Sequence, residues 1–192
     1  PYAIGSIDAS TLRSSGPMVN LSEAMARVPG LVVANRNNYA QDLQISSRGF
    51  GARAGFGVRG VRLYTDGIPA SMPDGQGQVS HFDLANAQRV EVLRGPYGNR
   101  SGGVIAAVSA PVRAGQFETG LDVGQYGLRQ WRVSAAAPLG NGFEARVGAS
   151  GLEWDGFRPQ SAASKTSANA RLAWQGERDR VIVLASVLDQ PA

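Results

Sequence analysis

The residues most suggestive of chemistry lie in a glycine- and arginine-rich segment, 45–57, with the sequence ISSRGFGARAGFG. Glycine lets backbone amides approach an anion closely, so such a segment could hold a phosphate group. Its spacing matches neither G-x-G-x-x-G nor G-x-x-x-x-G-K-[ST], and Lys165 is the only lysine in the chain. A nucleotide site is therefore not predicted.

Arginines and aromatic residues are mixed between positions 48 and 64, a composition that can stack on single-stranded nucleic acid and neutralise it. However, residues 1–110 carry ten arginines against seven acidic residues, a net charge of only +3. Ion pairs within the protein account for this balance better than a nucleic-acid partner does. No nucleic-acid partner is predicted, and an RNA-binding module is the alternative that a steep salt dependence of binding would reveal.

The composition also excludes most catalytic and metal sites. There is no cysteine and the single histidine is His81, so disulfides, zinc fingers and thiol nucleophiles are absent. Ser46 and Ser101 have neither a G-x-S-x-G context nor a second histidine to activate them. We expect no enzyme activity, no metal site and no resident cofactor.

Three polar loops could instead bind a ligand without any chemical step. They are predicted at 35–42, 50–57 and 69–80, where asparagine, glycine, glutamine and aspartate are frequent. Their amides, phenol and arginines could hydrogen-bond a hydrophilic, anionic chelate. Ordinary solvated loops have the same composition, so the residues alone leave both interpretations open.

The elements that must position these loops form a mixed α+β pattern over residues 1–110. Asn20 as N-cap and Glu23 in the capping-box position predict a helix that ends at Pro29-Gly30. Its apolar face would comprise Leu21, Ala24, Met25 and Val28. Asp66-Gly67 is a strong tight-turn signal, and apolar runs predict strands at 2–7, 31–33, 43–47, 58–64, 90–93 and 104–108.

The second part of the chain has a different pattern, in which every second residue is apolar or small. Phe117, Leu121 and Val123 alternate with Glu118 and Asp122, for example. Five such segments are predicted as strands, at 117–126, 128–139, 143–154, 167–175 and 180–188. Their length and terminal aromatic residues are typical of a transmembrane β-barrel, but a soluble antiparallel sheet alternates in the same way.

Five motifs occur in a fixed order: LSEAM at 21–25 with VPGL at 28–31, ISSRGF at 45–50, VRLYTDGIP at 61–69, VEVLRGP at 90–96 and YGNRSGGVI at 97–105. In this order they resemble the plug domain of TonB-dependent outer-membrane receptors. The segments FGVRG at 56–60 and MPDGQ at 72–76 are most similar to receptors of the ferric dicitrate and siderophore group.

The resemblance implies an α+β plug domain at 1–110, a small mixed sheet with short helices. The first antiparallel strands of a transmembrane β-barrel would follow at 111–192, in the bacterial outer membrane. A plugged barrel of this type has about 22 strands, and residues 111–192 supply five. We therefore expect the chain to be a fragment, without the remaining strands and without an N-terminal TonB box.

The implied function is a receptor and transporter for a ferric chelate, either a siderophore or ferric citrate, which is the transported ligand and not a cofactor. TonB would supply energy, and outer-membrane lipid would surround the barrel. The three loops become apical ligand-binding loops. Their candidate ligand-binding residues are Arg36, Asn37, Asn38, Tyr39, Gln41, Arg53, Phe56, Met72, Asp74, Gln76 and Gln78.

Two arginines have a different implied role. Arg48 and Arg94, each followed by glycine, would be buried anchors that pair with carboxylates of the barrel wall. The alternatives are a receptor of the same family for another nutrient, such as a cobalamin, another metal complex or an oligosaccharide, and a stand-alone soluble binding module.

Overall fold

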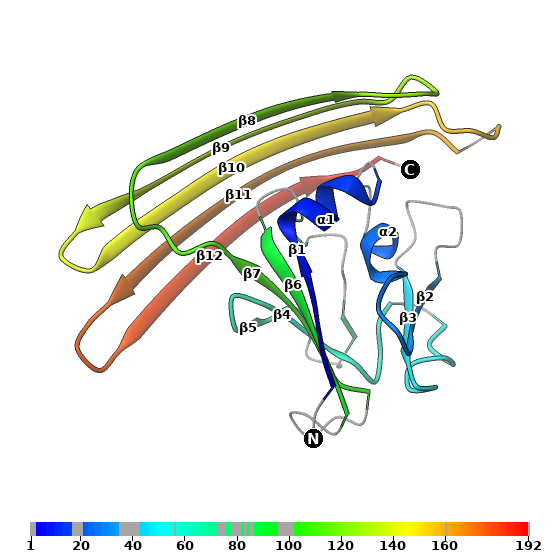
Figure 1. Cartoon of the computed structure of the whole chain (residues 1–192), viewed down its shortest axis with the longest axis horizontal. Helices are drawn as coiled ribbons and strands as arrows, with labels where there is room; N and C mark the ends of the chain where they lie inside the picture. The colour runs from blue at the N-terminus through cyan, green and yellow to red at the C-terminus, as the bar shows by residue number, and fades with distance from the viewer. Residues whose placement is uncertain are drawn as a thin grey trace. The chain divides into compact units, whose positions relative to one another are not determined.

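The computed structural model divides the chain into two compact units, Pro1–Ser109 and Ala110–Ala192. It describes residues 3–16, 21–34, 43–55, 57–72, 76–77, 82, 84, 87–95, 102–159 and 161–191. The units differ in architecture, as Figure 1 shows. The first is a mixed α+β unit with short strands, and the second is a single antiparallel sheet of long strands.

The first unit is built on a five-stranded mixed sheet with the order β1-β6-β7-β4-β5. Strand β7 pairs with β6 antiparallel and with β4 parallel, and β1 occupies one edge. A separate antiparallel pair joins β2 to β3. The bounds are β1 Ala3–Asp8, β2 Leu31–Ala34, β3 Gln44–Ser47, β4 Arg62–Thr65, β5 Ile68–Pro69, β6 Ala87–Arg94 and β7 Val104–Ser109.

One apolar core holds this unit together. Strand β6 shows the pattern that creates it, because Ala87, Val90 and Val92 are buried while their neighbours are exposed or half-buried. The core is completed by side chains from the helices, strands and loops, among them Leu12, Leu21, Met25, Ile45, Val58, Leu63 and Ile105, each at most 2% exposed. Burial of aliphatic side chains supplies the main driving force for folding.

The predicted helix is confirmed in its apolar face but wrong in its length. Leu21, Ala24, Met25 and Val28 are all buried, yet helix α2 covers only Ser22–Met25. The predicted cap Asn20 lies outside the described residues. The chain continues beyond Met25 in tighter turns, with hydrogen bonds from Arg27 N to Ala24 O and from Val28 N to Met25 O. Pro29 explains this early end, because a proline disfavours helical geometry at the preceding residue.

Helix α1, at Ala9–Ser14, was not located by the sequence pattern. The helix begins directly after β1 because Asp8 caps it. The Asp8 Oδ1 atom accepts hydrogen bonds from Thr11 N at 2.7 Å and from Ser10 Oγ at 2.8 Å. Only Leu12 is buried on this helix, so it lacks the apolar periodicity by which a helix is recognised in a sequence.

The predicted tight turn at Asp66-Gly67 is confirmed. Asp66 has φ +50° and Gly67 has φ +86°, and the two residues connect β4 to β5. Positive φ at both central positions is the geometry that favours Asp-Gly in two-residue hairpins. The Asp66 Oδ1 atom also accepts a hydrogen bond at 2.7 Å from the amide of Ser109, the last residue of β7.

The second unit is an antiparallel sheet in which each strand pairs with its sequence neighbours, in the order β12-β11-β10-β9-β8. The bounds are β8 Gln116–Val123, β9 Arg129–Gly140, β10 Phe143–Trp154, β11 Ala163–Gln175 and β12 Arg180–Asp189. All five predicted strands are present, and β10 has the predicted bounds. The alternation seen in the sequence is therefore the alternation of a real pleat.

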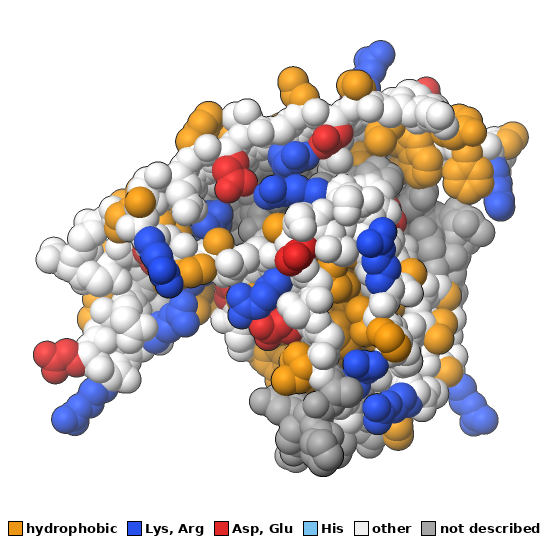
Figure 2. Space-filling view, viewed as in Figure 1, with side chains coloured by type: hydrophobic (Ala, Val, Ile, Leu, Met, Phe, Trp, Pro, Cys, Tyr) orange, Lys and Arg blue, Asp and Glu red, His pale blue; other side chains and the backbone are white. Residues whose placement is uncertain are grey.

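The register of this sheet separates apolar side chains from charged ones. Phe117, Leu121 and Val123 lie on one face, while Glu118 and Asp122 lie on the other. Figure 2 shows hydrophobic side chains along the convex side of the sheet. The exposed apolar side chains of the convex face are Phe117, Leu121, Val123, Trp131, Leu139, Phe143, Val147, Leu172, Val181, Val183 and Val187.

Aromatic side chains lie near both ends of the strands. Phe143 and Trp174 are register partners on the apolar face, with ring centroids 6.2 Å apart. Tyr126 and Phe157 are exposed in the connections at the opposite end. Aromatic belts at both ends of an apolar band are typical of strands that cross an outer membrane. Among the described residues, no helix is both long enough and apolar enough to span a membrane.

The Asp8 cap makes the first unit sensitive to pH. Hydrogen bonds from the Thr11 amide and the Ser10 hydroxyl lower the pKa of the Asp8 carboxyl below its ordinary value. A group whose pKa is lowered on folding contributes stability above its unfolded pKa and loses that contribution as the pH falls through its folded pKa. Asp8→Ala should therefore reduce the hydrogen-exchange protection of the Thr11 amide at pH 7. The difference from the wild type should shrink below about pH 4, and a difference that is independent of pH would contradict this account.

Substitution of Gly103 tests how closely the backbones of β6 and β7 approach where the two strands meet. Its φ is +97°, and a Cβ atom there would meet the carbonyl oxygen of Leu93. Gly103→Ala should lower the stability of the first unit by about 1–3 kcal/mol, because the substitution is strained and also clashes with backbone. Hydrogen exchange of the β6 and β7 amides measures this loss. Gly55→Ala is the matched control, since nothing lies within 4 Å of a Cβ at that position, and equal effects would rule out the explanation.

Candidate functional site

Three of the predicted ligand-binding residues lie within the described part of the chain. Arg53 is exposed on the second loop, and Met72 is 52% exposed on the third. Gln76, also on the third loop, is half-buried. The other predicted ligand residues, Arg36, Asn37, Asn38, Tyr39, Gln41, Phe56, Asp74 and Gln78, lie outside the described residues.

The second and third loops are joined by backbone hydrogen bonds. Val58 N donates to Gly77 O at 2.9 Å, and Gly77 N donates to Val58 O at 2.8 Å. The third loop also closes on itself, because Met72 N donates to Gln76 O at 2.8 Å. Segments about twenty residues apart in sequence therefore form one surface, as the candidate site requires.

Gln44 is hydrogen-bonded to the second loop, and Gln76 packs against it. The Gln76 side chain lies across Gly57, where a Cβ atom would be 2.5 Å from its Nε2 atom. Gln44, on β3, donates from Nε2 to Ala52 O at 2.6 Å. Arg53 follows Ala52 directly, so its exposed guanidinium projects from a loop with a braced backbone. A loop whose backbone is already held loses less conformational freedom when it binds a ligand.

The two Arg-Gly motifs meet at one turn of the first unit. Arg94 Nη1, on β6, donates to the carbonyl oxygen of Pro29. Arg48 N donates to the neighbouring carbonyl of Gly30 at 3.2 Å. The Pro29-Gly30 turn thus connects segments that are far apart in sequence. Sequence reasoning missed this role of Pro29, because a backbone acceptor leaves no signal in the residue type.

Arg48 belongs to a tight reverse turn. Ser47 and Phe50 exchange backbone hydrogen bonds of 2.9 Å, and between them Arg48 has φ +50° and Gly49 has φ +88°. Gly51 is equally constrained, since a Cβ there would lie 2.5 Å from the carbonyl oxygen of Ile45. The glycines of this motif therefore serve backbone geometry, in agreement with the rejection of a phosphate loop.

The two predicted anchors, Arg48 and Arg94, differ in burial. The Arg48 side chain is exposed and that of Arg94 is half-buried. The buried Nε atom of Arg94 has no hydrogen-bond partner among the residues that the structure describes. Such a donor is suited to a carboxylate, and pairing of Arg48 and Arg94 with carboxylates of the barrel wall remains a prediction.

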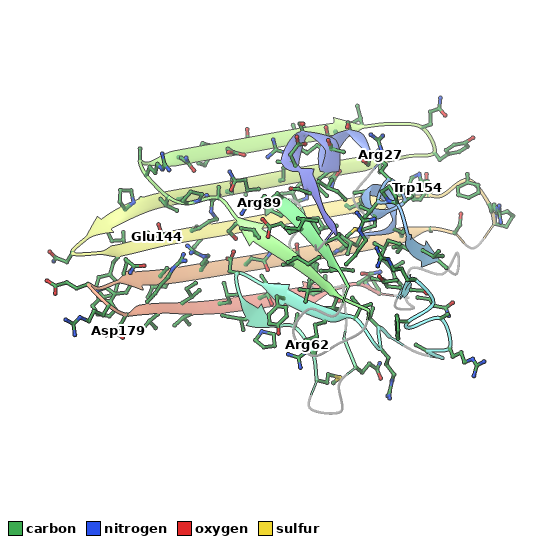
Figure 3. The ribbon with its side chains drawn as sticks, turned by 60° about the horizontal axis from the view of Figure 1, so that its bottom comes forward. Arg27, Arg62, Arg89, Glu144, Trp154 and Asp179 are labelled. Atoms are coloured by element: carbon green, nitrogen blue, oxygen red, sulfur yellow. The ribbon has the colours of Figure 1, made fainter. Side chains whose placement is uncertain are left out.

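The polar face of the second unit carries ion pairs that sequence reasoning did not identify. Arg171 Nη1 lies 2.7 Å from Glu144 Oε1, across neighbouring strands β11 and β10; Figure 3 shows Glu144 on β10. Arg132 pairs with Asp122, and its guanidinium crosses Gly120, which leaves room because it has no Cβ. The alternation of the strands could have predicted that these residues share one face of the sheet, but not which of them form ion pairs.

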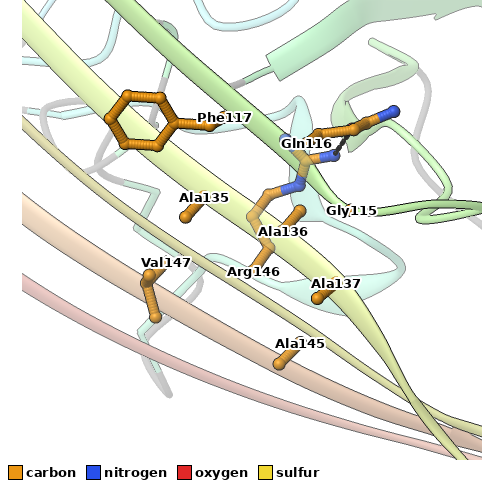
Figure 4. Close-up of a pocket in the computed structure, with 9 residues that line it drawn as sticks. All are labelled: Gly115, Gln116, Phe117, Ala135, Ala136, Ala137, Ala145, Arg146 and Val147. Carbon is orange, nitrogen blue, oxygen red and sulfur yellow. Dashed lines mark hydrogen bonds between the residues drawn. The ribbon is translucent and has the colours of Figure 1, made fainter.

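Neither a hollow in the sheet nor a metal cluster offers another ligand site in the described part of the chain. The hollow is shallow and mainly apolar, so it lacks the polar groups that would fix a hydrophilic chelate. No three His, Cys, Asp or Glu side chains of the described residues could hold a metal ion. Figure 4 shows the lining of the hollow, which is Gly115, Gln116, Phe117, Ala135, Ala136, Ala137, Ala145, Arg146 and Val147.

Comparison with known proteins identifies this combination of a mixed unit and an antiparallel sheet. The family model described as "TonB-dependent Receptor Plug Domain" matches residues 1–108. The chain therefore belongs to the TonB-dependent receptor plug domain family. It is a plug domain followed by the first antiparallel strands of an outer-membrane β-barrel, and its location is the bacterial outer membrane.

Solved structures of similar fold match both units. The siderophore receptor PirA from Pseudomonas aeruginosa is 22% identical, with a TM-score of 0.65 over 97% of this chain and 35% of that one. The pyoverdine outer membrane receptor FpvA from P. aeruginosa PAO1 is 19% identical, with a TM-score of 0.73 over 99% and 28%. The copper transporter OprC is 17% identical, with a TM-score of 0.72 over 97% and 30%. The chain thus spans about a third of the length of these receptors.

The Arg94 contact predicts a local effect at the Pro29-Gly30 turn. Arg94→Met removes the donor to Pro29 O, so the amides of Arg48 and Leu31, which hydrogen-bond within this turn, should exchange about tenfold faster. Hydrogen exchange resolved to single amides measures the change. Arg53→Ala is the control, because it removes an arginine that is exposed on another loop. Unchanged exchange in Arg94→Met would show that the turn does not depend on this contact.

Proposed function

We propose that the protein is a TonB-dependent receptor that imports a ferric chelate, either a siderophore or ferric citrate, and that its plug gates the barrel. The observation that carries this proposal is the exposed Arg53 on a braced loop, joined to the third loop through the Val58–Gly77 hydrogen bonds. An exposed cation on such a loop suits a hydrophilic anionic ligand. The similarity to PirA and FpvA supports iron chelates as the ligand class.

The connections of the sheet support an orientation for the receptor. Residues 124–128 and 155–162 connect strands at one end, whereas the connections at the other end are the shorter segments 141–142 and 176–179. Outer-membrane barrels have short periplasmic turns and longer extracellular loops. We therefore assign the end with 124–128 and 155–162 to the cell exterior. TonB, on the periplasmic side, is the proposed source of energy for remodelling the plug.

A receptor of the same family for another nutrient is the second candidate. The match to the copper transporter OprC favours a metal complex that is not a ferric chelate, and cobalamins and oligosaccharides are further options within the family. A stand-alone soluble module fits less well. The convex face of β8–β12 exposes many large apolar side chains, such as Leu121 at 84% and Val187 at 71%, and a soluble monomer rarely exposes such a patch.

Calorimetric titration of the complete receptor in detergent tests the ligand class. Ferric citrate, iron-free citrate, ferric siderophores of hydroxamate and catecholate type, and a cupric complex form the panel. We expect one ferric chelate to bind, and Arg53→Ala to weaken it about tenfold or more, since a charge-assisted hydrogen bond contributes about 1.5–3 kcal/mol. Arg178→Ala, which removes an exposed arginine from the connection between β11 and β12, should have no effect.

Three other results of the titration would change the proposal. Binding of the cupric complex alone would replace the ferric ligand with a different metal complex. Absence of heat with every ligand in the panel would contradict the proposal that metal chelates are imported. Equal weakening by Arg53→Ala and Arg178→Ala would remove the second loop from the ligand site.

A further inference from the structure

The segment that connects the two units, residues 110–115, is held by side chains from the polar face of β10. Arg146 Nη2 donates to Ala110 O at 3.3 Å, and Val112 N donates to Glu144 Oε2 at 3.3 Å. Arg146 Nη2 also donates to Gln116 Oε1 at 3.4 Å, at the start of β8; Figure 4 shows this contact. Two residues of one strand thus hold both ends of a connecting segment.

The spacing of these contacts follows from extended backbone. Ala110 and Val112 are two residues apart, as are Glu144 and Arg146, and side chains two apart on a strand share a face. The connecting segment runs antiparallel to β10, since Ala110 contacts Arg146 and Val112 contacts Glu144. An extended connecting segment therefore matches two successive positions of the polar face.

Arg171, on the neighbouring strand β11, holds the Glu144 carboxylate in place. Arg171 Nη1 lies 2.7 Å from Glu144 Oε1, which leaves Oε2 for the Val112 amide. Arg171 and Arg146 are register partners and are 7% and 8% exposed. The buried Arg171 cation is paired with Glu144, which is thereby held in place.

The residue before this segment, Ser109, is the last residue of the first unit and is hydrogen-bonded within that unit. Ser109 N donates to Asp66 Oδ1 at 2.7 Å, in the β4–β5 turn of the plug. Ser109 is thus fixed to the plug while Ala110, its neighbour, is fixed to β10.

We propose that Glu144 and Arg146, with Arg171 as the positioning residue for Glu144, form a linker clamp that retains the C-terminal end of the plug on the barrel wall while the rest of the plug is remodelled. This inference rests on the proposed gating function. The clamp confines release to the part of the plug that precedes β7, so the plug can return after each transport cycle. The charged residues Glu144, Arg146 and Arg171 belong neither to the ligand site nor to the Arg-Gly motifs, and the clamp gives them a role.

Trypsin digestion of the complete receptor in detergent tests the clamp without ligand or TonB. Arg113 lies in the connecting segment and is exposed. Trypsin nevertheless cleaves slowly while the backbone on both sides of Arg113 is bound to the sheet. Glu144→Ala and Arg146→Met should increase the cleavage rate after Arg113 about tenfold. Arg132→Met is the matched control, because it removes an ion-paired arginine from the same face without a contact to the segment. Its cleavage rate should stay within about twofold.

Hydrogen exchange of the Val112 amide gives a second readout, and it applies even where a variant folds poorly. In the wild type this amide should be protected, and in Glu144→Ala its protection should fall about tenfold while the β9 and β10 amides keep theirs. An unprotected Val112 amide in the wild type, or equal cleavage in all variants, would overturn the clamp.

Permeability of cells tests the retention of the plug. Sensitivity to vancomycin reports an open barrel. If the clamp retains the plug, cells with the Glu144→Ala receptor should become sensitive only when TonB is present, because TonB then remodels a plug that is no longer held at its C-terminal end. Faster cleavage with unchanged sensitivity would overturn the retaining role. A wild-type receptor that imports no chelate but shows the protected Val112 amide would instead contradict the proposed function and leave the clamp intact.

Discussion

Backbone hydrogen bonding is the constraint on which the second unit depends. Hydrocarbon offers no water to backbone N–H and C=O groups, so every strand that crosses a membrane must pair with its neighbours. Pairing fixes the register, and the register decides which side chains face lipid. Val183 and Leu184 illustrate this, since they are adjacent in sequence but lie on opposite faces of β12. A shift of one residue would turn the charged face toward lipid.

The same constraint arranges the polar face. Glu144 and Arg146 can hold the connecting segment together because the pleat places them on one face, and Arg171 reaches Glu144 because antiparallel pairing brings β11 alongside. The plug uses a different principle, since its short strands depend on an apolar core and on backbone contacts such as that of Arg94 with Pro29. Regular pairing thus organises the wall, and specific long-range contacts organise the plug.

The sequence predicted the parts of the fold that have a regular period. The strands of the second unit follow from alternation, and Asp66-Gly67 follows from turn chemistry. The length of α2 was wrong because the capping box and Pro29-Gly30 mark only the outer limits of a helix, and the chain changes to tighter turns after Met25. Helix α1 was missed because Leu12 alone carries no period. For the candidate site, sequence indicated Arg53 and Gln76 as loop residues but not the Val58–Gly77 hydrogen bonds that join their loops. The linker contacts were also missed, because residues more than thirty positions apart meet only after the sheet has formed.

Strands β8–β12 form a membrane-spanning wall with one lipid face and one polar face. Spin labels on single cysteines test it directly, and the chain contributes no cysteine of its own to interfere. Labels at residues 181–187 of the complete receptor in liposomes should alternate. Positions 181, 183, 185 and 187 should be accessible to oxygen dissolved in lipid, and positions 182, 184 and 186 should not. Absence of a two-residue period, or equal access of a water-soluble relaxation agent at all seven positions, would contradict the account.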